Sequence, residues 1–260
     1  MAIPKKIHYC WFGGNPLPKL AKKCIKSWKK YCPDYKIIEW NENNFDIASA
    51  PLYVRQAYEA KKWAFVTDYV RLKIVFEEGG VYFDTDVQVL KNIDCLLKDK
   101  GFFGFEYEKC ISTGLGFGAE KGNELILEMM ADYEEIPFLL DDGSFDLMSC
   151  PDRNTHVLIK YGLLQNNQLQ VVNGCTIYPS DYFSPKSYVT GKIKKTKNTL
   201  TIHHFSESWV SKDSKQKVKE YKKKIKKANC KHFWKILPNR ILIFLLGQKN
   251  YEKLKFKLKK

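Results

Sequence analysis

The sequence predicts an α/β domain followed by a basic tail, on three observations. Apolar residues make up 44% of the 260 residues and aromatic residues 14%, which suffices for one hydrophobic core and excludes a disordered or collagen-like chain. Segments with the periodicity of strands alternate with segments that have the periodicity of helices, as in parallel sheets covered by helices. The composition changes sharply beyond Ser211. We therefore expect a doubly wound α/β domain over residues 1–211 and a mainly helical basic extension over residues 212–260.

The opening segments predict a strand, a helix and a second strand. Lys6–Phe12 is rich in β-branched and aromatic residues and ends at the pair Gly13-Gly14. Lys19–Tyr31 has apolar residues on one helical face and lysines on the other. Lys36–Trp40 then has the composition of a short strand. A strand-helix-strand unit of this kind builds parallel sheets.

Helical periodicity continues from Leu52 to Glu78, in one or two pieces, and Gly79-Gly80 ends it. Val81–Leu90 then predicts one continuous strand. Its alternation places valines and Phe83 on a core face and Tyr82, Asp84 and Asp86 on the other. Further on, we expect strands at 102–105 and 199–205, and helices at 123–133 and 155–161.

The positive charge is confined to the tail. Residues 212–260 contain 18 basic and 3 acidic side chains, which accounts for the whole formal charge of +15, whereas residues 1–211 are balanced. A neutral body without a basic stripe argues against a nucleic-acid binder. The tail also carries an apolar run, Ile241–Leu246, that is too short to span a bilayer. The tail either docks on an anionic membrane surface or packs its apolar run on the core, and we expect the membrane contact.

Two sequence features bear on the compartment. The eight cysteines are scattered, with no spacing typical of zinc or thioredoxin sites, and we expect them to be buried and reduced. The amino terminus lacks the apolar stretch of a signal peptide. Together with the basic tail, these features predict a cytoplasmic protein at the inner face of the plasma membrane.

Asp84 and Asp86 are the first candidate for chemistry. Carboxylates two residues apart on a strand share one face, with Cα atoms about 6.6 Å apart, so they could share one divalent ion. Oxygen ligands favour Mn²⁺ or Mg²⁺. An Asp-x-Asp tripeptide is also common at solvated strand ends, but here it ends an apolar strand, where α/β sheets bind ligands.

Two further pairs admit both a structural and a functional interpretation. Asp68 and Arg71 lie three residues apart on a predicted helix. They form either a local ion pair or a pair of groups that hold a sugar and a phosphate. Trp11, Phe12 and Gly13 end the first strand, where an exposed ring could stack on a base and a glycine would admit a ligand. A tryptophan in the core is the commoner case.

The last candidate for chemistry lies at the end of the electrically balanced segment 1–211. His203-His204 precedes Ser208-Trp209, and a neutral imidazole is a competent third ligand for Mn²⁺, while an indole N–H can donate to an anionic leaving oxygen. Which of the two histidines would bind the metal stays open.

Taken in order, six segments resemble the Asp-x-Asp sugar transferases of glycosyltransferase family 32. That family includes bacterial capsule and polysaccharide enzymes and is similar to the catalytic domains of clostridial glucosylating toxins. The likeness is close over residues 3–90 and returns at 200–209. The segments are Ile3–Gly14, Ser27-Trp28 with Pro33–Tyr35, Trp40-Asn41, Thr67–Arg71, Gly79–Asp86 and His203–Trp209.

The resemblance implies a GT-A (Rossmann-like) fold and retaining transfer of a hexose from a nucleotide sugar, with UDP-Gal or UDP-Glc as the first donors to try. The acceptor would be a glycan or a lipid-linked oligosaccharide in capsule or surface polysaccharide synthesis. Matched position by position, each candidate residue takes a role. Trp11, Phe12 and Gly13 would hold the nucleotide, Asp68 and Arg71 the donor sugar, Asp84 the ribose and sugar, Asp86 and His204 the metal, Tyr82 and Ser208 the donor pocket, and Trp209 the glycosidic oxygen.

Removal of the diphosphate leaves negative charge that a divalent ion, Arg71 and Trp209 would stabilise. No carboxylate is evident in the sequence as a nucleophile, which favours front-face attack by the acceptor hydroxyl over a route through a covalent intermediate. Two other classes of function remain open. One is a polyanion or nucleic-acid binder with a metal-dependent, phosphoesterase-like site, and the other is an inactive, sugar-binding relative.

Overall fold

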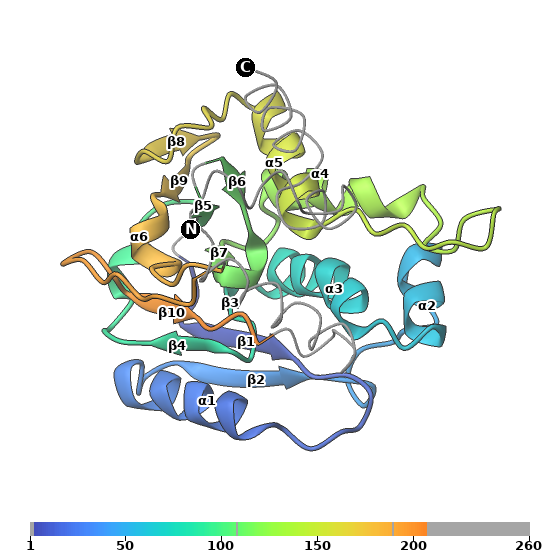
Figure 1. The fold of residues 1–260 in the computed structure, drawn as a ribbon, viewed down its shortest axis with the longest axis horizontal. Coiled ribbons are helices and arrows are strands. Elements are labelled where there is room, and N and C mark those ends of the chain that lie inside the picture. Colours follow the sequence, from blue (N-terminus) through green and yellow to red (C-terminus); the bar gives the residue numbers. More distant parts are fainter. Residues whose placement is uncertain (1–2, 108, 189, 207–260) are drawn as a thin grey trace, which may run out of the picture. The chain divides into compact units, whose positions relative to one another are not determined.

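The computed structural model describes residues 3–107, 109–188 and 190–206, and Figure 1 shows the order of their elements. The expected extension at 212–260, together with Ser208 and Trp209, lies outside these residues. The helices are α1 (Lys19–Tyr31), α2 (Leu52–Glu59), α3 (Trp63–Glu78), α4 (Glu124–Glu134), α5 (Cys150–Lys160) and α6 (Ser180–Phe183). The strands are β1 (Lys6–Cys10), β2 (Lys36–Trp40), β3 (Gly80–Tyr82), β4 (Val87–Val89), β5 (Gly101–Tyr107), β6 (Cys110–Ile111), β7 (Phe117–Ala119), β8 (Gln170–Val172), β9 (Cys175–Tyr178) and β10 (Thr201–His203).

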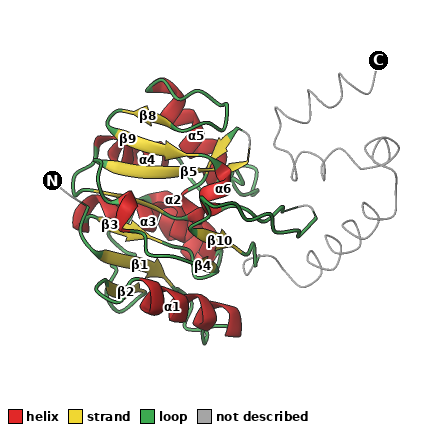
Figure 2. Ribbon diagram, turned by 90° about the vertical axis from the view of Figure 1, so that its left-hand side faces the viewer, coloured by secondary structure: helices red, strands yellow, loops and turns green. Residues whose placement is uncertain are grey.

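The main sheet is mixed and follows the order β2-β1-β3-β7-β5-β9-β8, with β6 paired to β5. Strands β2, β1 and β3 run parallel, and β7 pairs antiparallel with both β3 and β5. Figure 2 shows the strands stacked from β2 to β8. The opening strand-helix-strand unit is present as predicted, and the predicted α/β class is confirmed.

Two hydrophobic clusters cover opposite faces of the main sheet. The first packs helices α2, α3, α4 and α5 on side chains such as Tyr82, Phe103 and Phe105. The second joins α1 to the other face through Trp28, Val81 and Phe102, together with β4. The alternation of neighbouring residues between the two clusters is what a sheet covered on both faces requires.

A separate two-stranded sheet lies on the second face, where β4 pairs antiparallel with β10. Helix α1 anchors it, because the Trp28 indole donates to the carbonyl of Val87 (2.7 Å) and the Ser27 hydroxyl accepts from the amide of Val89 (3.0 Å). The register places His203 opposite Val87. A residue 116 positions beyond Val87 is thereby brought next to the Asp84–Asp86 segment.

The predicted continuous strand 81–90 is wrong. The chain leaves the main sheet after Tyr82, turns so that the amide of Val87 donates to the carbonyl of Asp84 (2.9 Å), and re-enters a different sheet as β4. Apolar alternation is the same on either side of such a turn, so the pattern alone does not reveal it. Asp84 and Asp86 therefore lie on a turn between two sheets and not on one strand face.

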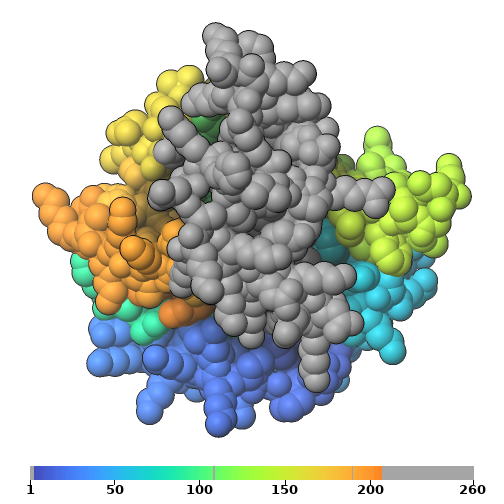
Figure 3. Space-filling model, in the orientation of Figure 1, coloured from blue at the N-terminus to red at the C-terminus, as the bar shows by residue number. Residues whose placement is uncertain are grey.

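Other elements differ from expectation in detail. The helical segment 52–78 is divided into α2 and α3, and the predicted helix at 155–161 begins earlier, at Cys150, where the Ser149 hydroxyl caps the amide of Asp152. Between α4 and α5, a loop that pairs Leu139 with Phe145 projects from the body (Figures 1 and 3). Among the described residues, no helix is both long enough and apolar enough to cross a membrane.

His8 on β1 is completely buried and makes two hydrogen bonds that fix its neutral tautomer. Its Nε2 lies 2.9 Å from the carbonyl of Gly79 and therefore carries the proton, and its Nδ1 accepts from the Trp40 indole at 3.1 Å. Burial lowers the pKa of His8 to about 4. Protonation would remove the acceptor that Trp40 uses.

This arrangement predicts a specific loss of stability in mild acid. Between pH 6.5 and 4 the unfolded chain protonates His8 and the folded chain does not, so the His8 contribution is present above about pH 6.5 and is lost as pH falls toward 4. The loss amounts to at most about 3 kcal/mol. Urea unfolding from pH 7 to pH 4.5 should show a smaller acid loss in His8→Gln than in the unchanged chain, whereas the exposed His156→Gln should follow the unchanged chain. Equal acid losses in the unchanged chain and in His8→Gln would contradict the assignment.

Candidate active site

The candidate site lies at the carboxyl edge of the parallel strands. Trp11 follows β1 and Asp84 follows β3, and the two strands run side by side, with the amide of Phe83 donating to the carbonyl of His8 (3.0 Å). Ligands of open α/β sheets bind outside the carboxyl ends of strands. The Trp11 segment and the Asp-x-Asp segment therefore lie at the same edge of the sheet.

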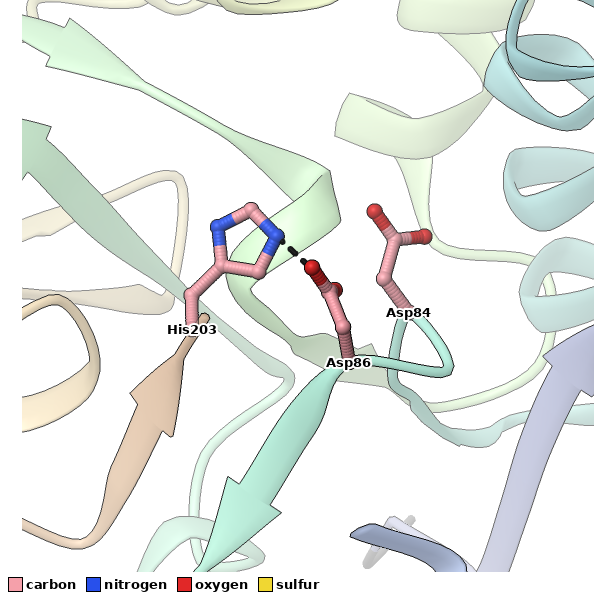
Figure 4. Close-up of side chains that lie close together, drawn as sticks. All are labelled: Asp84, Asp86 and His203. Carbon is pink, nitrogen blue, oxygen red and sulfur yellow. Dashed lines mark ion pairs between the residues drawn. The ribbon is translucent and has the colours of Figure 1, made fainter. Parts of the chain in front are cut away.

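Asp84, Asp86 and His203 converge at this edge (Figure 4). One ligand atom from each lies within 4.8 Å of the others, close enough to surround a single cation. Asp86 and His203 are nearly buried, with side chains 10% and 12% exposed, whereas Asp84 is 29% exposed and gives the cluster an open side. The turn between β3 and β4 supplies the carboxylates, and β10 supplies the imidazole.

Asp86 is held in its ionised form. Burial opposes ionisation, but His203 Nε2 at 3.1 Å and the amide of Ser206 at 2.6 Å outweigh it, so the pKa of Asp86 lies below its usual value. In return, Asp86 raises the pKa of His203 to about 9, against the opposing effect of burial. Asp86 is thus a fixed acceptor whose position is set from two sides.

Asp84 belongs to a second set of contacts centred on Arg71. Arg71 bonds Asp68 Oδ1 through Nη2 (2.5 Å), lies 3.6 Å from Asp84 Oδ1 through Nη1, and donates to the Thr67 carbonyl through Nε (2.9 Å). The Tyr82 hydroxyl donates to the same Asp84 oxygen at 3.0 Å. The predicted neighbours Asp68 and Arg71 are therefore part of one buried network with the Asp-x-Asp segment.

The electrostatics of this network favour a bound cation. Burial raises the pKa of Asp68 to about 6 and also raises that of Asp84, because three aspartates share a desolvated region with one arginine. Because the pKa of His203 is raised to about 9, His203 is protonated in the bare chain at pH 7, and Asp68, Asp84, Asp86, Arg71 and His203 together carry a formal charge of −1. A divalent cation would replace the His203 proton and balance the charge of −2 that the other four groups carry. Burying negative charge without a counter-charge is energetically unfavourable, so a cation bound here would stabilise the folded chain.

Two further observations fit a metal ion. Gly114 keeps space open, because a Cβ there would lie 2.8 Å from Asp84 Oδ2 and 3.1 Å from Arg71 Nη1. Two carboxylates and an imidazole form a donor set that suits Mn²⁺. The residues present therefore fit the predicted divalent ion.

The three residues at the end of the first strand, Trp11, Phe12 and Gly13, have different surroundings in the structure. Phe12 is buried in the core and packs edge-on against Phe45, with ring centroids 6.2 Å apart, so its ring faces the core and not solvent. Trp11 is partly exposed, and its indole donates to the carbonyl of Asn15 (2.5 Å). Gly13 has a φ of +88°, and a Cβ there would lie 2.7 Å from the ring of Trp63, so both its conformation and its surroundings require glycine.

The closing motif resolves differently from the expectation. His203, and not His204, lies beside the two carboxylates, because the β10 register points alternate residues to opposite sides. The His204 ring lies 3.0 Å from Gln88 Oε1, and its backbone amide donates to the carbonyl of Asp86 (3.1 Å). Of the two histidines left open by the sequence, His203 is the one in the group that could hold a metal ion, and His204 makes a positioning contact instead. Ser208 and Trp209 remain predictions.

Sequence reasoning missed three residues next to the site. These are Ser112, Gly114 and Glu106, which come from β5 and the segment after β6. The run Gly114, Gly116, Gly118 was the only sequence signal here, and it does not say which glycine faces the carboxylates.

Residues 18–103 match the model of a protein family described as "Glycosyltransferase sugar-binding region containing DXD motif". The match covers about a third of the chain and includes Asp68, Arg71, Asp84 and Asp86. It supports the predicted resemblance to DXD sugar transferases over these residues. The matched region ends before Glu106, Gly114 and His203, so the third member of the cluster comes from outside it.

Several curated proteins are similar to parts of the chain. "Inositol phosphoceramide mannosyltransferase 3" of Schizosaccharomyces pombe is 28% identical over 141 residues, which is 53% of this chain and 39% of that protein. "Initiation-specific alpha-1,6-mannosyltransferase" of Candida albicans is 29% identical over 127 residues, 45% of this chain and 32% of that protein. "Subversion of eukaryotic traffic protein A" of Legionella pneumophila is 25% identical over 111 residues, which is 33% of this chain and 17% of that protein. The chain thus spans well under half the length of these relatives.

Solved structures give more distant likenesses. "PaToxG Glycosyltransferase" aligns with a TM-score of 0.48 at 20% identity, over 61% of this chain and 70% of that chain. A glycosyltransferase involved in glycosylation of the major capsid of PBCV-1 aligns with a TM-score of 0.44 at 14% identity, over 84% and 98%. Likenesses this distant bear on neither donor nor acceptor.

Proposed function

We propose that this chain is a metal-dependent glycosyltransferase with a GT-A fold that moves a hexose from a nucleotide sugar to a glycan or lipid-linked oligosaccharide. One observation carries the proposal. The Asp-x-Asp pair of the matched family region meets His203 within 4.8 Å at the carboxyl edge of the sheet, beside a buried arginine. Cation ligands next to a guanidinium at such an edge suit a bound diphosphate.

Each residue then has a physical task. Asp84, Asp86 and His203 would hold the divalent ion, which supplies charge neutralisation on the diphosphate when bound. Asp68 fixes Arg71 so that its guanidinium is aimed without reorganisation at the donor, where it hydrogen-bonds phosphate or sugar oxygens. Trp11 would stack on the base, and Trp209 would donate to the glycosidic oxygen.

The reaction we propose retains the anomeric configuration, as the resemblance implies. The acceptor oxygen forms a bond to the anomeric carbon on the face that the diphosphate leaves. The bond from that carbon to the phosphate oxygen breaks, and its electron pair leaves with the diphosphate. The acceptor proton passes to a phosphate oxygen of the leaving group, so no protein nucleophile is consumed.

The biological setting is proposed from the sequence alone. We place the enzyme in bacterial capsule or surface polysaccharide synthesis, in the cytoplasm, with residues 212–260 on the anionic inner face of the plasma membrane. The excess of basic residues in that segment supports the membrane contact. Flotation with anionic liposomes should retain the full chain and not a chain ending at residue 211, and equal flotation of both would remove the membrane contact from the proposal.

A donor screen tests the activity. UDP-Glc, UDP-Gal and GDP-Man are incubated with the full chain and Mn²⁺, and released nucleotide is measured with and without EDTA. GDP-Man is included because two similar proteins are named mannosyltransferases. We expect hydrolysis of at least one UDP-hexose that EDTA abolishes and Mn²⁺ restores. Hydrolysis that persists in EDTA would rule out the metal role, and hydrolysis of GDP-Man alone would replace the proposed donor.

A further inference from the structure

Strand β5 carries one carboxylate on the face of the sheet where the site lies. Phe103 and Phe105 point into the first hydrophobic cluster, under helices α2 to α5, and Phe102 points into the second cluster, on the opposite face of the sheet. A Cβ on Gly104 would lie 2.3 Å from the ring of Phe183, a member of that opposite cluster. Glu106 is the next residue of the series Phe102, Gly104, at the end of β5 where the regular pairing is interrupted.

An irregularity in pairing aims this side chain. The register of β5 with β6 shifts between Phe105 and Tyr107, so Glu106 occupies a bulge. A bulge bends its strand and re-aims the extra residue, and bulges are common beside active sites. The residue at the bulge, Glu106, is the one acidic residue of β5, and His203 of the cation cluster lowers its pKa.

Glu106 is continuous with the site through Ser112. The amide of Ser112 donates to the carbonyl of Gly104 on β5 (3.3 Å), so Ser112 lies next to the end of that strand. Burial raises the pKa of Glu106, whereas His203 and Ser112 lower it. The Ser112 hydroxyl oxygen is 3.5 Å from the point where a Cβ on Gly114 would lie, and that point is 2.8 Å from Asp84 Oδ2. Glu106, Ser112 and Asp84 therefore border the same space, which the absence of a side chain at residue 114 leaves open.

The negative charge of the Glu106 carboxylate is energetically unfavourable at this position. It adds negative charge near Asp84, burial raises its pKa, and no lysine or arginine of the described residues forms an ion pair with it. Phosphate oxygens would be repelled by it, whereas a hydroxyl group can donate to it. A ligand group that suits this position is therefore a sugar hydroxyl and not the diphosphate.

The geometry points to Glu106 as a residue that accepts a hydrogen bond from a sugar hydroxyl at the reacting centre. This inference rests on the proposed function and adds a contact for the sugar that lies outside the matched family region. The hydroxyl belongs either to the transferred hexose or to the acceptor. Both sources present the same chemistry, and their kinetic consequences differ.

The test compares Glu106→Gln and Glu106→Ala with the surface control Glu59→Gln, all in the full chain. Three quantities are measured with Mn²⁺: affinity for UDP by calorimetry, hydrolysis of UDP-Glc or UDP-Gal without acceptor, and transfer to a panel of methyl hexosides. We expect UDP affinity within about twofold of the unchanged chain and transfer lowered about 10- to 100-fold in Glu106→Ala, the range for one hydrogen bond to a charged group. Hydrolysis that falls with transfer assigns the contact to the hexose, and a fall in transfer alone assigns it to the acceptor.

Two results would overturn the inference. One is transfer and hydrolysis within twofold of the unchanged chain in both variants. The other is loss of UDP and Mn²⁺ binding in Glu106→Gln with an unchanged unfolding temperature, which would make Glu106 part of the cation site. If the unchanged chain itself binds neither UDP nor Mn²⁺, the proposed function fails first, and the two failures are thereby distinguished.

Discussion

Asp86→Asn is expected to lower metal-dependent transfer about 10²- to 10³-fold while the chain stays folded, the range found when one group that stabilises transition-state charge is removed. The amide keeps the shape of Asp86 and its contact to the amide of Ser206, but it removes the negative charge that faces His203 and the cation. Mn²⁺ affinity by calorimetry and initial rates over a Mn²⁺ titration provide the two readouts. Affinity and rate should fall together.

The matched control is Asp141→Asn, which removes the same charge from an exposed loop. It should leave rate and affinity unchanged. An Asp86→Asn chain that keeps full activity in EDTA would contradict the metal role, because neither the ligand nor the ion would then be needed. Near-ultraviolet circular dichroism separates loss of the site from loss of the fold.

Arg71→Met is expected to destabilise the fold by about 3–5 kcal/mol, in addition to abolishing activity. Arg71 is 4% exposed and is shared between Asp68 and Asp84, so its removal leaves the buried Asp68 and the partly exposed Asp84 without their cation. Breaking a buried pair from one side has a cost of this size, far above that of a surface pair. Urea unfolding at pH 7 measures the effect.

The control for this substitution is Arg55→Met, at an exposed position of α2. It should cost well under 1 kcal/mol. Mn²⁺ should restore part of the stability lost in Arg71→Met, because the cation offsets the same carboxylates. If Arg71→Met is as stable as Arg55→Met, the buried network does not carry the charge balance that we describe.

The parts of the site that sequence patterns predict are those that lie within one element. Asp68 and Arg71 share a helix face, and Asp84 and Asp86 share a tripeptide, so spacing alone brings each pair together. The α/β class also follows from local patterns, because strand and helix periods alternate along the chain. These predictions require no knowledge of which strands become neighbours.

The parts that the sequence does not predict depend on pairing between distant segments. The choice of His203 over His204 is set by the register of β10 against β4, and a shift of one residue would reverse it. Glu106, which we propose contacts a sugar hydroxyl, lies at a bulge in β5, and no residue pattern predicts such a bulge. The turn after Tyr82 is hidden for the same reason, since two short strands in different sheets have the alternation of one long strand.

We propose that Asp84, Asp86 and His203 hold a divalent cation beside the donor. This can be tested on crystals of the full chain soaked with MnCl₂ and UDP, with diffraction recorded at the manganese absorption edge. We expect one anomalous peak within coordination distance of all three side chains, with the diphosphate next to it. A peak elsewhere, or nucleotide bound with no manganese between Asp84 and Asp86, would contradict it.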